Sequence, residues 1–359
     1  MKERGLLMVV TAPADATLRA DVAAGRRPCP EYIALERDHG VELVDWSALG
    51  GRPRRRTRIS AARLALASIP RVRNAAAVLS DGEPVGIPLA LAMQALRIRT
   101  PHLMIGHRLT APHKRPFFTV LRSQRGITRI LVHSRRQIGL IPELGIPAEK
   151  LALVHYHADT QFWRPMGGVQ ERLVMAAGRE QRDYATLARA STGLDAEVFI
   201  ADGSAHTPAA RHARASSVPS NVRLGYLPYT DLRDMYGRAQ VVVVPLLPND
   251  FQAGVTTLLE AMAMGKAVIV SETSGQLDVV HDGVNGITVP TGDPHRLRVA
   301  IEFLLDHPEE RERLGRNARR DVQRSHSLSM YAHKLADHLH DISRGTEVGM
   351  QPFVAGGER

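Results

Sequence analysis

The chain has 359 residues, 44% of them hydrophobic and 23% charged, which is the composition of a soluble folded protein and a length that favours two domains. Lys and Arg outnumber Asp and Glu by 47 to 37, and the formal charge of +10 favours anionic ligands such as nucleotides or an anionic membrane surface. Cys29 is the only cysteine, which excludes an intrachain disulfide and a multi-cysteine zinc site.

The first apolar run, residues 6–10, is too short for an export signal or a membrane span, and we expect a cytoplasmic protein. Short aliphatic runs then alternate with helical patterns, which predicts parallel sheets flanked by helices. A first set of strands is expected at residues 6–10, 41–44, 75–79, 102–105, 130–132 and 151–154. A second set is expected at residues 173–176, 196–201, 222–224, 241–244, 267–270 and 286–289.

The sequence therefore predicts an α/β protein whose two doubly wound domains face each other across a deep cleft, where ligands bind in such folds. A Pro- and Gly-containing stretch separates an N-terminal Rossmann-like domain, expected over residues 1–165, from a C-terminal one over residues 166–325. C-terminal helices should follow. The helix within 326–343 is expected to pack back on the N-terminal domain, and residues 344–359 to form a flexible tail.

Several familiar motifs are missing from the sequence. No glycine-rich dinucleotide fingerprint follows the first strand, which disfavours a nicotinamide or flavin enzyme. The run that ends in Gly265 and Lys266 lacks the first glycine of a phosphate-binding P-loop. There is no H-E-x-x-H sequence and no basic stretch interleaved with aromatic residues, so we expect no metal, no cofactor and no nucleic acid as a ligand.

The most informative segment is 241–290, where a valine-rich strand leads through a polar loop into a helix. The loop ends at Gly254, and the helix is expected over residues 255–264. Free backbone N–H groups and the helix dipole point toward such a loop, so it can bind an anion. Glu260 lies in the middle of the apolar helix, where a carboxylate is costly to bury unless it accepts hydrogen bonds, for example from ribose hydroxyls.

These residues carry a family resemblance. The second half of the chain resembles the C-terminal domain of family 4 retaining glycosyltransferases, which have the GT-B fold of two facing Rossmann-like domains. The similar positions are 259–269, Gly275, 282–286, Gly178, Arg179 and 221–225. The sequence departs from the family at Gln252, where a glutamate is usual, and it has no glycine-rich loop after the first strand. The lysine that usually follows the Gly-Arg pair is missing, and Arg182 is its best substitute.

The resemblance implies roles for individual residues. In the second half, these are Arg179, Arg182, Val255, Thr256 and Thr257 at the donor diphosphate, Glu260 at the ribose, Tyr226 and Leu227 at the base, and Gln252, Ala253 and Gly254 at the transferred sugar. In the first half, His107 is expected to face the reacting sugar and to act in catalysis together with Gln252. Lys114 and Arg115 follow in a loop, where their charges either favour an acidic acceptor or are simply solvated.

The implied activity is metal-independent, retaining transfer of a hexosyl or uronosyl group from a nucleotide diphosphate-sugar to a natural product, glycan or lipid. A nucleotide-sugar 2-epimerase of the same fold and a non-catalytic nucleotide-sugar-binding protein remain as alternatives. Peripheral membrane contact is a further hypothesis, with a solvated helix as its alternative. It rests on a basic cluster followed by apolar residues: Arg52, Arg54, Arg55, Arg56, Arg58, Ile59, Ala62, Leu64, Leu66 and Ile69.

Overall fold

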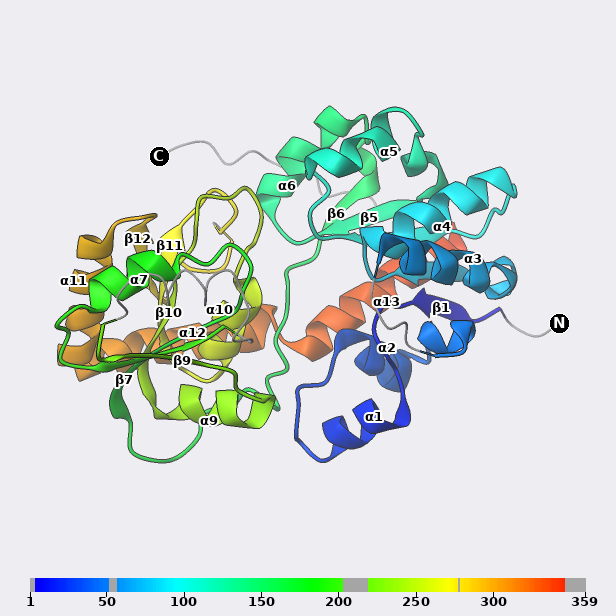
Figure 1. Cartoon of the computed structure of the whole chain (residues 1–359). Helices are drawn as coiled ribbons and strands as arrows, with labels where there is room; N and C mark the ends of the chain where they lie inside the picture. Colours follow the sequence, from blue (N-terminus) through cyan, green and yellow to red (C-terminus); the bar gives the residue numbers. More distant parts are fainter. Residues whose placement is uncertain (1–3, 52–56, 203–218, 277, 346–359) are drawn as a thin grey trace.

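The computed structural model describes residues 4–51, 57–202, 219–276 and 278–345, and these form two domains, each built on a parallel sheet (Figure 1). The first sheet has the order β2-β1-β3-β4-β5-β6 and the second the order β12-β11-β10-β7-β8-β9. The first consists of β1 (Leu6–Val9), β2 (Glu42–Val44), β3 (Ala77–Ser80), β4 (His102–Gly106), β5 (Arg129–Val132) and β6 (Leu151–Leu153). The second consists of β7 (Glu171–Ala177), β8 (Glu197–Ala201), β9 (Val222–Gly225), β10 (Ala239–Val244), β11 (Ala267–Glu272) and β12 (Ile287–Pro290). The twelve predicted strands are thus confirmed, with ends shifted by a few residues.

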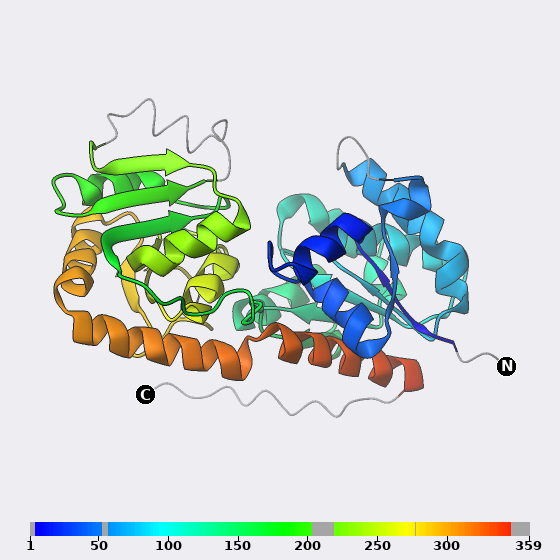
Figure 2. The ribbon, with the colours of Figure 1, turned by 90° about the horizontal axis from the view of Figure 1, so that it is seen from below.

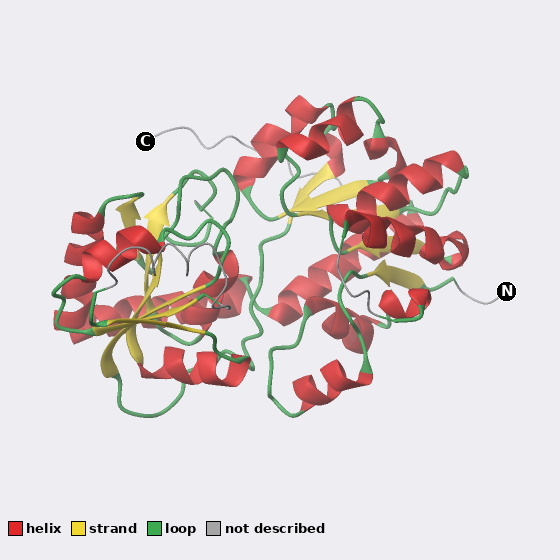
Figure 3. Ribbon diagram, viewed as in Figure 1, coloured by secondary structure: helices red, strands yellow, loops and turns green. Residues whose placement is uncertain are grey.

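Helices cover both faces of the first sheet (Figure 3). Alternate strand residues point to opposite faces, so Met8 packs with α1, α2 and α13 while Val9 packs with α3 and α4. The helices of this domain are α1 (Ala16–Ala23), α2 (Glu31–His39), α3 (Arg58–Asn74), α4 (Glu83–Ala95), α5 (Arg115–Thr119) and α6 (Arg135–Leu140). Short 3₁₀ turns lie at Trp46–Leu49, Pro112–Lys114, Ser123–Gly126, Ile141–Leu144 and Ala148–Lys150.

The second sheet is also covered on both faces. Val242 and Val244 pack toward α9, α10 and α12, whereas Val241 and Val243 pack toward α7 and α11. Because β10 is buried on both faces, it reads as a continuous valine run rather than an alternating one. The helices are α7 (Tyr184–Ser191), α9 (Tyr229–Arg238), α10 (Val255–Ala263), α11 (Pro294–Asp306) and α12 (Pro308–Ser325).

The last described helix, α13 (Leu328–Arg344), returns the chain to the N-terminal domain. Figure 2 shows α12 and α13 along one side of the molecule, one under each domain. Tyr331 and Leu335 of α13 are buried in the N-terminal core beside α2. At the crossing, the N–H of Leu328 donates to the carbonyl of Ala158 over 2.9 Å, which ties α13 to the interdomain linker.

Helix α3 corrects one expectation from the sequence. Leu64 and Ile69 are buried in the core, so the apolar residues after the basic cluster do not share one exposed face. Ile59 and Leu66 are 74% and 58% exposed. Of that cluster, Arg58 begins α3, and the arginines at 52, 54, 55 and 56 lie outside the described residues. Within the described part of the chain, no helix is long and apolar enough to cross a membrane.

Candidate functional site

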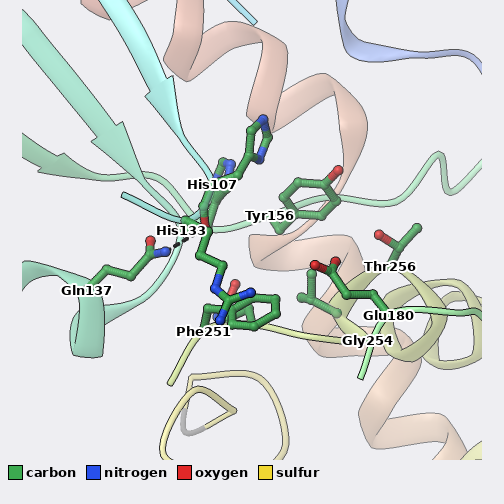
Figure 4. Close-up of a pocket in the computed structure, with 11 residues that line it drawn as sticks. His107, His133, Gln137, Tyr156, Glu180, Phe251, Gly254 and Thr256 are labelled. Atoms are coloured by element: carbon green, nitrogen blue, oxygen red, sulfur yellow. Dashed lines mark hydrogen bonds between the residues drawn. The ribbon is translucent and has the colours of Figure 1, made fainter. Parts of the chain in front are cut away.

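A cavity of about 170 Å³ lies between the two domains, at the carboxyl ends of their strands (Figure 4). Its N-terminal wall consists of His107, Arg108, His133, Gln137 and Tyr156. Its C-terminal wall consists of Glu180, Phe251, Gln252, Gly254, Val255 and Thr256. His107 follows β4, His133 follows β5, and Gly254 ends the loop after β10, so both Rossmann-like halves place their strand ends at one site.

The N-terminal wall is oriented by hydrogen bonds to the backbone. His107 places Nε2 2.9 Å from the carbonyl oxygen of Asp81, and His133 places Nδ1 2.8 Å from that of Val154. A carbonyl only accepts, so both nitrogens carry hydrogen. Gln137 donates from Nε2 to the carbonyl of His107 over 2.6 Å, shown as the dashed line in Figure 4. These bonds hold the side chains in place before any ligand binds.

Two of these side chains, His133 and Gln137, each have a second polar atom that is not bonded to any residue the structure describes. His133 Nε2 and Gln137 Oε1 are buried and have no hydrogen-bond partner among the described residues. Burial, followed by the charge of His107, lowers the pKa of His133 to about 3, so its ring is neutral near pH 7 and Nε2 can accept a hydrogen bond. Unpaired buried polar atoms are costly, and a hydroxyl-rich ligand would satisfy them.

Asp81 lies behind this wall, at the end of β3. Its carboxylate accepts hydrogen bonds from the backbone N–H and the hydroxyl of Thr11. Burial raises the pKa of Asp81 to about 6, even though the bonds from Thr11 act in the opposite direction. The Asp81 carboxyl therefore has a pKa only about one unit below neutral pH, and the carbonyl of the same residue binds His107.

Lys114, the predicted acceptor residue, is held by a buried carboxylate. Its Nζ lies 3.0 Å from Glu83 Oε1 and donates to the carbonyl of Arg108 over 2.9 Å. Burial disfavours the charge of Glu83, but the charges of His107 and Lys114 outweigh it and lower the pKa of Glu83 below its usual value. Arg115 begins α5 and is exposed. Neither Lys114 nor Arg115 lines the interdomain cavity, and Lys114 lines a separate apolar pocket of about 150 Å³.

In the C-terminal wall, two glycines determine the path of the loop that carries Gln252. Gly254 has φ +82°, and a Cβ there would lie 2.8 Å from Val244 and 3.1 Å from Arg182. A Cβ on Gly275 would overlap the carbonyl oxygen of Phe251, so the loop passes directly over this glycine. Both amide atoms of Gln252 are buried and lack a hydrogen-bond partner within the described residues. The backbone alone therefore brings Gln252 to the cavity.

A buried arginine lies beneath the first turn of α10. Arg182 donates from Nε to the carbonyl of Ala177 over 2.9 Å and from Nη2 to the hydroxyl of Thr257 over 3.1 Å. Gly178, with φ +100°, leaves the space that the guanidinium occupies. Burial lowers the pKa of Arg182, but an arginine keeps its charge in proteins. The positive charge thus adds to the helix dipole at the start of α10.

Arg179, which the sequence ranks first for the diphosphate, is placed differently. It is exposed, and its Nε donates to the carbonyl of Asp202 over 2.9 Å. Arg182, rather than Arg179, contacts α10. Sequence spacing placed both after β7, and only the fold decides which of them turns inward.

Glu260 lies in α10 and is only 9% exposed. Burial raises its pKa to about 8, against the lowering effect of the nearby charge of Arg182. Among the residues that the structure describes, none donates a hydrogen bond to this carboxylate. Tyr226 is 66% exposed after β9, and Leu227 is partly buried against the same core as α10.

The structure thus brings part of the predicted site together. His107, Gln252, Gly254, Val255 and Thr256 line one cavity. The other predicted residues do not line it: Arg179, Arg182, Thr257, Glu260, Tyr226, Leu227, Ala253, Lys114 and Arg115. Of these, Arg182, Thr257 and Glu260 lie on or against α10, next to the residues that open onto the cavity.

Sequence reasoning missed His133, Gln137 and Tyr156. His133 directly follows β5, the same position at a strand end that singled out His107 after β4. That signal was available for His133. Gln137 and Tyr156 carry no such signal, because helix α6 and the linker after β6 bring them to the cavity only in the folded chain.

No group of three or more His, Cys, Asp or Glu in the described ranges could hold a metal ion. The cavity instead offers hydrogen-bonding groups, a cation and a helix start. The guanidinium of Arg108 lies 4.4 Å from the ring centre of Phe251, across the two walls. Such a site fits a polar ligand with hydroxyls at one end and an anionic group at the other.

The family model of "Glycosyl transferases group 1" matches residues 183–321, which include α10 and the loop before it. The chain is also similar to the alpha-D-kanosaminyltransferase of Streptomyces kanamyceticus, with 26% identity over 281 residues, or 72% of each chain.

Two solved structures share the whole fold. Sucrose-phosphate synthase of Thermosynechococcus elongatus superimposes with a TM-score of 0.73 at 16% identity, over 96% of this chain and all of the other. HepE of Anabaena, solved in complex with UDP and glucose, gives a TM-score of 0.70 at 14% identity, over 94% of this chain and all of the other. The protein therefore has the GT-B fold. The match of its C-terminal domain to the model of group 1 glycosyl transferases and its similarity to the kanosaminyltransferase support glycosyltransferase activity.

Proposed function

We propose that the protein is a retaining glycosyltransferase of the family 4 type, which moves a sugar from a nucleotide diphosphate to an acceptor without a metal ion. In this reaction the bond between the anomeric carbon and the diphosphate breaks, and a bond to an acceptor hydroxyl forms on the same face of the sugar. The observation that carries the proposal is the first turn of α10, which opens onto the cavity through Gly254, Val255 and Thr256 and has Arg182 beneath it.

The charge of the leaving diphosphate decides which groups matter most. Charge-assisted hydrogen bonds contribute roughly 1.5 to 3 kcal/mol each, against about 0.3 to 2 kcal/mol for a helix terminus. Because the guanidinium of Arg182 is bonded to the protein and does not line the cavity, we propose that it acts through its charge beneath the start of α10. The N–H groups of that helix start are proposed to bind the diphosphate, with Arg179 in an outer position. Glu260 is proposed to accept hydrogen bonds from the ribose, and Tyr226 and Leu227 to lie at the base.

On the sugar side, we propose that His107, His133 and Gln252 contact hydroxyls of the transferred group. Gln252 brings no negative charge, whereas Arg108 brings a positive charge to the same cavity, and its Nε is buried without a partner among the described residues. This combination favours an anionic donor sugar such as a uronic acid. Faster transfer from nucleotide-linked glucuronic acid than from glucose, reversed in Arg108→Gln, would support this preference. Equal rates would contradict it.

The acceptor is proposed to enter from the N-terminal domain, where Lys114 and His113 rim the apolar pocket beside the cavity. A lipid acceptor would bring the protein to a membrane surface. Contact would then involve Ile59 and Leu66, the two large exposed apolar residues of α3.

A thermal-shift screen tests the donor. UDP is the first probe, since HepE is seen with it, followed by UDP-sugars and other nucleotide sugars. A ligand at a hundred times its dissociation constant should stabilise the protein by about 2.7 kcal/mol. Transfer or slow hydrolysis of the same donor, unchanged by EDTA, is then expected. No stabilisation by any nucleotide or nucleotide sugar would contradict the proposal.

Because Gln252 stands where a glutamate is usual in the similar family, the experiments must also test a non-catalytic binding function. A protein that binds a nucleotide sugar in calorimetry but neither transfers nor hydrolyses it, also after Gln252→Glu, is a binding protein. Turnover by the wild type, or its appearance in Gln252→Glu, supports an enzyme. The comparisons give no support to the epimerase alternative. Release of an epimerised sugar in the absence of an acceptor would be the evidence for it.

A further inference from the structure

A second hollow, of about 600 Å³, lies in the N-terminal domain at the amino ends of the strands, away from the cleft. It is formed by the segments that precede β1, β3 and β4 and by the end of α13. Four of its lining residues are arginines: Arg4, Arg73, Arg97 and Arg99. The remaining lining residues are neutral, so no carboxylate faces these guanidinium groups within the hollow.

The arginines of this hollow are not neutralised elsewhere. Throughout the described ranges, none of the four forms an ion pair or a side-chain hydrogen bond. Arg71, two residues before Arg73, shows the contrast, since it pairs with Glu42 at 3.5 Å. Four like charges around one hollow repel each other, and an anion bound between them would relieve that repulsion.

The backbone that carries these side chains is held firmly. The N–H of Ala76 donates to the carbonyl of Gly5 over 2.9 Å, and that of Val78 to the carbonyl of Pro101 over 2.9 Å. The hydroxyl of Thr100 donates to the carbonyl of Val72 over 2.8 Å. Because these bonds join all three connecting segments, the backbone positions from which the four arginines extend are fixed relative to each other.

Guanidinium groups pair with phosphate oxygens through two parallel hydrogen bonds, and several together suit a ligand with several charges. We propose that this hollow binds a phosphate-bearing ligand with at least two negative charges, as a free phosphate compound or as the headgroup of an anionic lipid. Leu96, which is 47% exposed at the rim, offers an apolar contact beside the charges. The site is separate from the donor cavity, because the two lie at opposite ends of the strands.

Calorimetric titration with inorganic pyrophosphate tests the proposal. The variant Arg97→Ser with Arg99→Ser removes two guanidinium groups from exposed positions, so the fold should persist. Arg125→Ser with Arg324→Ser is the matched control, since both residues are exposed, lie outside the hollow and carry the same total charge. We expect one binding site to weaken at least tenfold in the first variant only, as the loss of two charge-assisted bonds requires.

The donor cavity can bind pyrophosphate too, so the number of sites separates the two proposals. If the cleft binds as proposed, the first variant goes from two sites to one. If the cleft does not bind, it goes from one to none. Protection of Arg97 and Arg99 from phenylglyoxal by pyrophosphate, mapped by mass spectrometry, locates the site without any substitution.

Sedimentation with phosphatidylcholine vesicles, with and without phosphatidylglycerol, distinguishes the ligand sources. Pyrophosphate binding without vesicle binding identifies a free phosphate ligand. Vesicle binding that requires phosphatidylglycerol and is lost in the first variant identifies a lipid headgroup. Equal loss in both double variants, or no binding of either probe, overturns the proposal and leaves these arginines as partners of the nearby helix C-termini.

Discussion

The two walls of the interdomain cavity are built in different ways. In the N-terminal wall, His107, His133 and Gln137 each use one polar atom to bind a backbone carbonyl. In the C-terminal wall, the side chain of Gln252 has no such bond among the described residues, and neither does that of Glu260 in α10 behind the wall. The protein itself therefore orients one wall, whereas we expect a ligand to complete the other.

Among the substitutions that test this comparison, we expect the largest effect from Arg182, on the affinity for UDP. Arg182→Met should weaken UDP binding at least a hundredfold, because the variant loses the charge beneath α10 and frees the carbonyl of Ala177 and the hydroxyl of Thr257. Arg179→Met, at an exposed position, should weaken binding only a few fold. Calorimetry measures both, with thermal unfolding as a check on the fold. The opposite ranking would show that the sequence-based choice of Arg179 was right.

Glu260 should give the protein a distinctive pH dependence. Its folded pKa of about 8 lies above the unfolded value of 4.5, so the native state holds the proton more tightly. The stability that Glu260 contributes is then complete below pH 4.5, and it falls by about 1.4 kcal/mol per pH unit between about 5 and 8.

Glu260→Gln should remove the part of the slope that Glu260 contributes, which above pH 6 is separate from that of Asp81. Urea unfolding of both proteins at several pH values measures the difference. Parallel curves for wild type and variant would show that Glu260 is not buried as an acid. A bound nucleotide whose ribose requires the carboxylate should release a proton near pH 7, which calorimetry in buffers of different ionisation enthalpy detects.

Gly275 tests whether the path of the backbone positions Gln252 in the C-terminal wall. Gly275→Ala would place a methyl group on the carbonyl of Phe251 and displace the loop that carries Gln252. We expect a loss of about 1–3 kcal/mol in stability and roughly a tenfold loss of turnover. Gly139→Ala is the control, since a Cβ there meets no atom within 4 Å, and it should leave turnover intact.

His133 gives the smallest expected effect. Its low pKa keeps the ring neutral from pH 5 to 8, so His133→Asn should lower kcat/KM by about tenfold, through one lost hydrogen bond, without moving the pH profile. His281→Asn, at an exposed position outside the cavity, serves as control. A profile that shifts in His133→Asn but not in the control would show that His133 is charged in the working enzyme.

Much of this architecture follows from the sequence because it depends on local patterns. Valine-rich runs such as Val241 to Val244 bury both faces of a strand and can be recognised without knowing their neighbours. Gly254 before an apolar helix is a local pattern too, and it predicts an anion-binding turn without knowledge of the tertiary structure. The spacing of these signals is enough to predict two Rossmann-like halves and the segment in which we propose the donor site.

Tertiary structure alone decided which side chains meet. Arg182 turns under α10 while Arg179 stays at the surface, and Leu64 of α3 is buried while Leu66 is exposed, although local patterns treat these positions alike. Arg135 pairs with Asp278 across the domains at 3.2 Å, over a separation of 143 residues. The physical reason is that secondary structure depends on neighbours in sequence, whereas burial and charge pairing depend on neighbours in space.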